Sequence, residues 1–174
     1  EGSGLVDLAS SDLELTMDGL KKQTEGLRFT GISVPKDAII TNAYIEFNAD
    51  ETQPDITDLA FYAQTADNPG TFTTATNNIS SRTKTINSVN WGDINVWTIN
   101  QKYRTPDLSP VVQEIIGRSG WTSGNALVFI VTGTGHRTAD SVEGGAAVAP
   151  KLVITYAVDP SAPTPTPTLL PTAT

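Results

Sequence analysis

Apolar and polar residues alternate along three segments in the first half of the chain, which is the pattern of a strand with one buried face. In residues 12–17, leucine and methionine occupy the odd positions, and charged or polar residues occupy the even ones. Segments 43–49 and 59–63 also place apolar residues at their odd positions. We therefore predict strands over these three segments, with the odd-numbered side chains in the core.

Later segments predict further strands. Residues 126–131, Ala-Leu-Val-Phe-Ile-Val, are apolar at every position, which is typical of a central strand covered on both faces. Segments 27–29 and 152–156 are shorter strand candidates, and the second closes the domain. Residues 71–102 are polar and rich in Thr and Asn, so we expect long loops and short strands there.

One helix interrupts the strands. Five apolar residues follow the spacing i, i+3, i+4, i+7 and i+8, namely Leu108, Val111, Val112, Ile115 and Ile116. We predict a helix over about residues 109–117, with Ser109 as N-cap, Pro110 at the first helical position and Gly117 ending it in the left-handed conformation. Many strands with one short helix indicate an all-β sandwich whose helix plugs an end or bridges the sheets.

The chain ends in a segment of different composition, residues 159–174, in which Pro and Thr alternate. Proline lacks an N–H and fixes φ, so this segment is expected to be extended polyproline II. We divide the chain into an extended N-terminal segment (1–10), a β-sandwich domain (11–158) and a Pro/Thr tail or linker (159–174). A β-domain followed by such a stalk is typical of a protein displayed outside a cell.

Covalent glycans are expected at two places. Threonines of Pro/Thr stalks are often O-glycosylated, and the candidates are Thr164, Thr166, Thr168 and Thr172. Asn78 begins the triplet Asn-Ile-Ser, an N-glycosylation sequon of a kind that also arises by chance.

Composition narrows the class of protein. The 174 residues include no cysteine, which excludes disulfides and Cys-ligated metals, and the net charge is −8. An acidic chain without a basic run is a poor partner for nucleic acid or for an anionic membrane surface. The longest apolar run is too short to span a bilayer. We interpret the chain as the mature form or an excised fragment of an extracellular or cell-surface protein of a prokaryote.

The order of several short motifs resembles a known family. The motifs are Gly26-Leu27-Arg28-Phe29, Val34-Pro35-Lys36-Asp37-Ala38, Ile39-Ile40-Thr41-Asn42-Ala43-Tyr44-Ile45-Glu46-Phe47, Thr105-Pro106-Asp107-Leu108, Gly124-Asn125-Ala126-Leu127 and Ala149-Pro150-Lys151-Leu152-Val153-Ile154-Thr155-Tyr156. Over residues 13–156 this order is similar to the DNRLRE-type jelly-roll modules of bacterial extracellular proteins, some of which bind carbohydrate. The resemblance implies a jelly-roll-like β-sandwich of two sheets and a non-catalytic module.

The sequence offers little for catalysis. His136, the one histidine, lies close in sequence to Asp140 and Ser141. A hydrolytic triad needs residues that converge from separate segments beside an oxyanion site. Neighbours on one polar loop are more often solvated, and no carboxylate pair stands out among the 19 acidic residues. We therefore expect a protein that is not an enzyme.

Two acidic loops are candidates for calcium, which prefers hard oxygen ligands. The first holds Asp50, Glu51, Asp55 and Asp58, and the second holds Asp140 and Glu143. Neither has the spacing of an EF-hand loop. Acidic loops in contact with solvent are the more frequent explanation of such clusters, so calcium is the less favoured of two interpretations.

Aromatic residues could form a platform for sugar rings. Trp91, Trp97 and Tyr103 lie in the loop-rich part, where exposed rings would be functional, whereas Trp121 follows the helix and is expected in the core. For Trp91 and Trp97, packing beneath long loops is the more frequent arrangement, so sugar binding is the less favoured of two interpretations.

Both ends of the chain suggest contacts between copies. Leu5, Val6 and Leu8 belong to a short strand-like piece that could pair with the sheet edge of a neighbour. In the tail, the candidate contacts are Pro165, Pro167, Leu169 and Leu170. We expect a non-enzymatic extracellular structural module that assembles head-to-tail into a surface filament. The alternative is a carbohydrate-binding module tethered by its stalk to an enzyme or adhesin.

Overall fold

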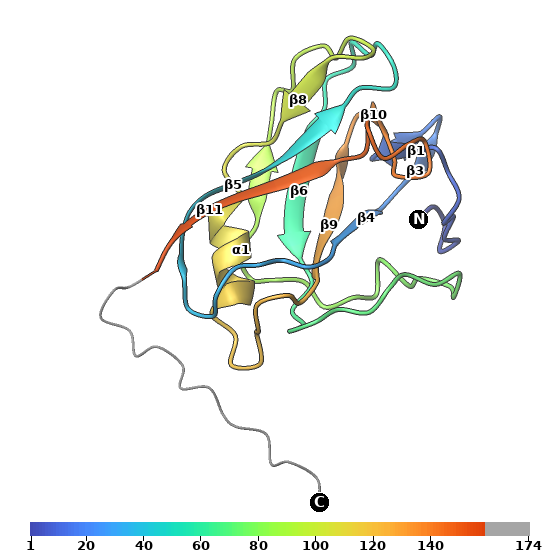
Figure 1. Ribbon diagram of the computed structural model, residues 1–174. Coiled ribbons are helices and arrows are strands. Elements are labelled where there is room, and N and C mark those ends of the chain that lie inside the picture. Colours follow the sequence, from blue (N-terminus) through green and yellow to red (C-terminus); the bar gives the residue numbers. More distant parts are fainter. Residues whose placement is uncertain (159–174) are drawn as a thin grey trace, which may run out of the picture.

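The computed structural model describes residues 1–158, which form a β-sandwich with one short helix (Figure 1). The elements are β1 (Asp12–Leu15), β2 (Met17–Asp18), β3 (Lys21–Lys22), β4 (Glu25–Phe29), β5 (Ile39–Asn48), β6 (Asp58–Ala63), β7 (Val89–Trp91), β8 (Lys102–Arg104), α1 (Ser109–Ile116), β9 (Leu127–Thr134), β10 (Arg137–Asp140) and β11 (Lys151–Ala157). The all-β prediction with one helix is confirmed. The predicted tail, with its glycan and assembly residues, lies outside the described residues.

Two sheets form the layers of the sandwich. One has the strand order β11–β5–β8 and the other β4–β9–β6–β7, and every neighbouring pair is antiparallel. Strand β1 pairs with β10, and an isolated bridge between Ala49 and Ala139 joins this pair to the end of β5. Strands β2 and β3 form a small hairpin.

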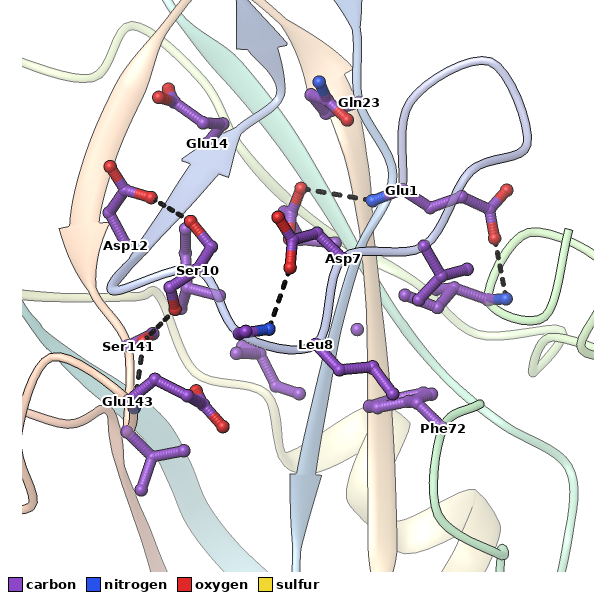
Figure 2. A pocket seen from close by; sticks show the side chains of 18 of the residues that line it. Glu1, Asp7, Leu8, Ser10, Asp12, Glu14, Gln23, Phe72, Ser141 and Glu143 are labelled. Atoms are coloured by element: carbon purple, nitrogen blue, oxygen red, sulfur yellow. Dashed lines mark hydrogen bonds and ion pairs between the residues drawn. The ribbon is translucent and has the colours of Figure 1, made fainter. Parts of the chain in front are cut away.

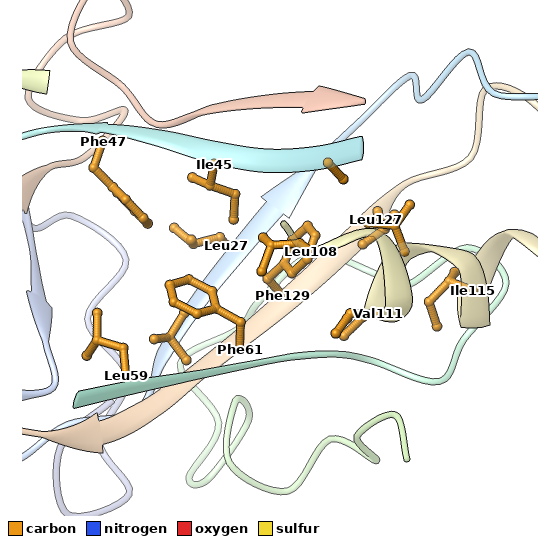
Figure 3. Close-up of a cluster of buried hydrophobic side chains, with 14 of the residues drawn as sticks. Leu27, Ile45, Phe47, Leu59, Phe61, Leu108, Val111, Ile115, Leu127 and Phe129 are labelled. Carbon is orange, nitrogen blue, oxygen red and sulfur yellow. The ribbon is translucent and has the colours of Figure 1, made fainter. Parts of the chain in front are cut away.

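The odd-numbered side chains of β5 from Ala43 onward and those of β6 point into the space between the sheets, as their alternation predicts (Figure 3). Phe47 and Phe61 are both fully buried, and their ring centroids are 6.4 Å apart. Burying one such side chain contributes about 1.5–3 kcal/mol, so this layer supplies much of the stability. The segment 12–17 differs from the prediction, because the strand is interrupted between Leu15 and Met17.

Strand β9 is covered on both faces, as its unbroken apolar run predicts. Leu127, Phe129 and Val131 belong to the main core. Val128 and Ile130 point the other way and form a second buried cluster with Val6 and Ile79. The outer face of this strand is therefore covered by the N-terminal segment and by the 71–82 loop.

Helix α1 packs its buried residues Val111, Val112, Ile115 and Ile116 against β5 and β6 and closes one end of the sandwich (Figure 1). Three predicted details of its ends are wrong. Leu108 is the N-cap, so Ser109 is the first helical residue and Pro110 the second, and Ser109 N–H donates to Asp107 Oδ1 at 2.9 Å. Gly117 is right-handed, because its N–H binds Gln113 O at 3.0 Å and the chain continues into a further turn.

The eight residues of α1 are too few for a membrane-crossing helix, and no other helix occurs within residues 1–158. Trp121, which follows α1, is buried, and its indole N–H donates to Val34 O at 3.0 Å. Its predicted place in the core is therefore confirmed.

Candidate functional site

A groove runs along the β4 side of the sandwich (Figure 2). Its volume is about 1060 Å³, which is ample for a ligand. Its walls come from residues 5–10, from β1, from β4 and from the loop after β10. These segments are distant in sequence, so residue patterns alone could not show that they meet.

The N-terminal segment forms one wall because it packs on its own domain. The Glu1 carboxylate accepts hydrogen bonds from the backbone N–H groups of Ile79, at 2.7 Å, and Ser80, at 3.1 Å. Val6 is buried, whereas Leu5 is 73% exposed and Leu8 is 42% exposed. The strand-like piece predicted over these residues is not formed, because Leu5 N–H and O instead close a tight turn with Gly2.

The lining of the groove is strongly acidic. Seven lining residues are Asp or Glu, and only Lys21 and Arg28 are basic. Burial raises the pKa of Glu14, although a contact of 2.6 Å with His136 Nε2 opposes this effect. Burial also raises the pKa of Glu25, although the Glu1 ammonium 3.6 Å away opposes this effect, and the nearby negative charges of Glu14 and Asp12 add to the rise. The groove therefore favours positive charge.

Apolar side chains also line the groove. Leu13 and Phe29 pack against the main core, Phe72 packs against the second buried cluster, and Leu8 is 42% exposed. Such a mixture of apolar lining and a few charged groups is typical of sites that bind a ligand with both properties.

The backbone of β4 also faces the groove. Strand β4 is the edge strand of its sheet and pairs with β9 alone. Residues 25–29 all line the groove and, within residues 1–158, make no backbone hydrogen bond outside that ladder. In an antiparallel pair every second residue directs its N–H and C=O away from the partner. Those groups of β4 are open to the groove.

The residues considered for a hydrolytic triad have separate partners. His136 contacts Glu14, and its ring nitrogens lie 3.1 Å and 3.2 Å from Gln53 Nε2. Asp140 Oδ2 accepts a hydrogen bond of 2.6 Å from Asn48, and Ser141 Oγ donates one of 2.6 Å to Ser10 O. Within the described chain the three do not bond to one another.

The acidic residues do not group in the structure as the two loops of the calcium prediction would require. Asp50 and Asp140, which the sequence assigned to different loops, lie near each other. Burial raises the pKa of Asp50, and repulsion from Asp140, Asp12 and Glu51 adds to the rise. Asp58 instead accepts the backbone N–H of Asp93 at 3.0 Å, and Asp55 and Glu143 are exposed. Across residues 1–158, no three His, Asp or Glu side chains are grouped in a way that could hold a metal ion.

The aromatic platform predicted for sugars is not exposed. Trp97 is fully buried, stacks on Tyr103 with centroids 4.8 Å apart and 6° between the planes, and lies 6.0 Å from Trp91. Trp91 and Tyr103 are half-buried. Of the two interpretations of Trp97, packing beneath a loop is therefore the one that the structure bears out, and the exposed sugar platform is not formed around this ring.

Sequence reasoning missed Arg137, which is fully buried in β10. Its guanidinium donates to Thr57 Oγ1, His136 O, Ile94 O and Asn95 O at 2.6–3.1 Å. It forms no ion pair within residues 1–158. A lone Arg in a polar segment has no periodic signal, so only the tertiary structure reveals that it fixes the loop leading to Trp97.

Asn78, the predicted glycan acceptor, uses its side chain internally. Its Oδ1 accepts hydrogen bonds from Thr73 N–H at 2.9 Å and from Arg82 at 3.2 Å. A glycan on Nδ2 would leave this oxygen bonded, since the modification is made on the nitrogen.

Comparison with protein-family models and with curated proteins gives no match. The resemblance to DNRLRE-type modules therefore stays a prediction. Any functional proposal for this chain rests on its own geometry.

Proposed function

We propose that this chain is a non-enzymatic structural module of the cell exterior that associates with copies of itself into a surface fibre. The observation that carries the proposal is the free edge of β11. This strand pairs only with β5, and within residues 1–158 its other side has no backbone partner. An unpaired edge of this length is a template for another strand.

The side chains at this edge support pairing between copies. Val153, Tyr156 and Val158 are 37%, 39% and 57% exposed, and Ile39 on the adjoining strand is 56% exposed. Natural edge strands are usually protected by Lys, Pro or a short length. Here the only charge of β11 is Lys151, at its first position. A bulge between Thr155 and Tyr156 is a second protective feature, so the stretch between Lys151 and the bulge is the unprotected part of the edge.

Two kinds of assembly can use this edge. Two β11 strands that face each other would close into a two-fold dimer, whereas pairing of β11 with a different surface of the next copy would continue without limit. The fibre proposal needs that second surface. The Pro/Thr tail, which lies outside the described residues, is the candidate that the sequence supplies.

The proposal is tested by light scattering and electron microscopy of the 174-residue chain over a range of concentrations. We expect concentration-dependent association of the wild type, and its loss in Val153→Lys, because a charge on the edge opposes pairing. Ile86→Lys is the matched control, since Ile86 is 95% exposed and lies in a loop away from β11. A monomeric wild type, or unchanged assembly in Val153→Lys, would contradict the proposal.

Carbohydrate binding is the alternative function. The buried position of Trp97 removes the centre of the aromatic platform on which that hypothesis depended. Unchanged tryptophan fluorescence on addition of soluble polysaccharides is the expected result.

A further inference from the structure

We propose that the groove along β4 binds an extended polypeptide segment of a partner protein, in which Lys or Arg alternates with apolar residues. The segment would add a strand to the free edge of β4. This site is separate from the β11 edge used by the proposed assembly. The two proposals can therefore fail independently.

The backbone of β4 supplies the first requirement. Residues 25–29 form one edge of the four-stranded sheet, and all of them line the groove. Their outward N–H and C=O groups have no backbone partner within residues 1–158. An added strand would satisfy these groups with hydrogen bonds, which provide affinity without requiring a particular sequence.

Charge supplies the second requirement. The lining carries seven acidic residues against two basic ones, and one of the two, Arg28, already donates to Pro69 O at 3.0 Å. Asp7 and Glu143 are exposed, and within residues 1–158 the carboxylate of Glu143 has no hydrogen-bond or ion-pair partner. Cationic side chains on the ligand would complement these groups and speed the encounter.

Apolar lining supplies the third requirement. Leu8 and Phe72 line the groove (Figure 2), and Phe72 packs against the buried cluster on the outer face of β9. Successive side chains of an added strand point to opposite sides. A ligand that alternates apolar and cationic residues would therefore place its apolar side chains beside Phe72. Its cationic side chains would point to the opposite side, toward Glu25 and the nearby Glu14 and Asp12.

The same chemistry excludes the chain's own tail as the occupant. Residues 159–174 contain no Lys or Arg and several prolines. Such a segment offers no positive charge to an acidic groove. A flat sugar would use neither the free backbone groups of β4 nor the excess of negative charge.

The test measures binding of synthetic peptides to the 174-residue chain by fluorescence anisotropy. The probe is a capped peptide in which Lys and Val alternate over about seven residues, the length of an ordinary strand. We expect it to bind, with perturbed amide resonances at residues 25–29 in a labelled sample. Affinity should fall as salt rises from about 20 mM to about 500 mM, because the charged groups lie near the surface.

Two control peptides separate the contributions. Replacement of every Lys by Glu should abolish binding, since like charges then face each other. Methylation of alternate backbone nitrogens should also abolish it if ladder hydrogen bonds form. Equal binding of all three peptides would show non-specific adsorption and would overturn the proposal, as would failure of the Lys/Val peptide to bind at millimolar concentration.

Protein variants locate the site. The double variant Asp7→Asn, Glu143→Gln should bind the Lys/Val peptide about three- to tenfold more weakly, the effect of two partly exposed ion pairs. The matched control, Asp55→Asn with Asp93→Asn, neutralises two exposed acids outside the groove and should bind as the wild type does. Equal weakening by both variants would assign the effect to net charge and reject the groove.

Discussion

The two long sides of the sandwich end in different ways. Strands β7 and β8 form one side, where Trp91, Trp97 and Tyr103 stack across the gap between the sheets. Strands β4 and β11 form the other side. Within residues 1–158 all four of these edge strands lack a second backbone partner, but β4 and β11 have five and seven residues, whereas β7 and β8 have three each. Large rings fill the first side, the closed side, and the second, the open side, has the two longer free edges. The two proposals above place interaction on the open side, and the rings place much of the stability on the closed side.

The largest effect is expected at the closed side, for Trp97→Ala. Trp97 is fully buried among Phe47, Trp91 and Tyr103, so its removal leaves a large cavity and should cost about 3–5 kcal/mol in the free energy of unfolding. Urea denaturation measures this cost. Trp97→Phe is the milder variant if the alanine variant does not fold. A cost below about 1 kcal/mol for alanine would show that the ring is not part of the core.

The next effect is expected for Arg137→Met, on the same side. Methionine fills much of the volume but leaves Ile94 O and Asn95 O without their donor, and Thr57 Oγ1 keeps only the backbone N–H of His136. Unsatisfied buried acceptors should lower the free energy of unfolding by about 2–3 kcal/mol. Faster hydrogen exchange in residues 92–97 should accompany the loss. If exchange there is unchanged, Arg137 does not fix this loop.

A smaller effect is expected on the open side, for Leu152→Ala. Leu152 packs against the main core from β11 but is only half-buried. Its truncation should cost about 1–2 kcal/mol, below the range for fully buried leucines. The same urea titration as for Trp97→Ala gives the comparison. A cost equal to that of Trp97→Ala would remove the proposed difference between the sides.

The smallest effect concerns how the stability of the domain depends on pH through Glu14, which lines the groove. Burial raises the pKa of Glu14, so its contribution to stability is full below the unfolded pKa and is lost as pH rises through the folded pKa. Glutamine cannot ionise. Glu14→Gln should therefore lose less stability than the wild type between about pH 4 and about pH 7, measured by thermal unfolding.

Glu114→Gln is the control with the opposite sign. Burial alone would raise the pKa of Glu114, but hydrogen bonds from the backbone N–H groups of Asn87 and Ile86 hold it below its ordinary value. Its contribution is therefore present above the unfolded pKa and is lost as pH falls through the folded pKa. The variant should be less stable than the wild type at neutral pH. If the difference in stability between variant and wild type changed with pH in the same direction for both variants, the assignment for Glu14 would be contradicted.

Periodicity predicted the parts of the fold whose burial is regular. Phe47 and Phe61 follow an alternation that a strand converts into one buried face, and the stripe from Leu108 to Ile116 follows the turn of a helix. The end of α1 was predicted less well, because Gly117 adopts either hand at little cost. The sequence left both interpretations of Trp97 open for a related reason: residue type does not say whether a loop folds over a ring.

By itself, the sequence determined a cysteine-free, acidic β-sandwich with one short helix, because hydrophobic periodicity depends only on local geometry. Only the tertiary structure decided that Trp97 is buried, that Arg137 fixes the neighbouring loop, and that residues 1–10 form a wall of an acidic groove. These features arise where segments distant in sequence meet. Their contacts depend on the packing of the whole domain, which no local pattern of residues encodes.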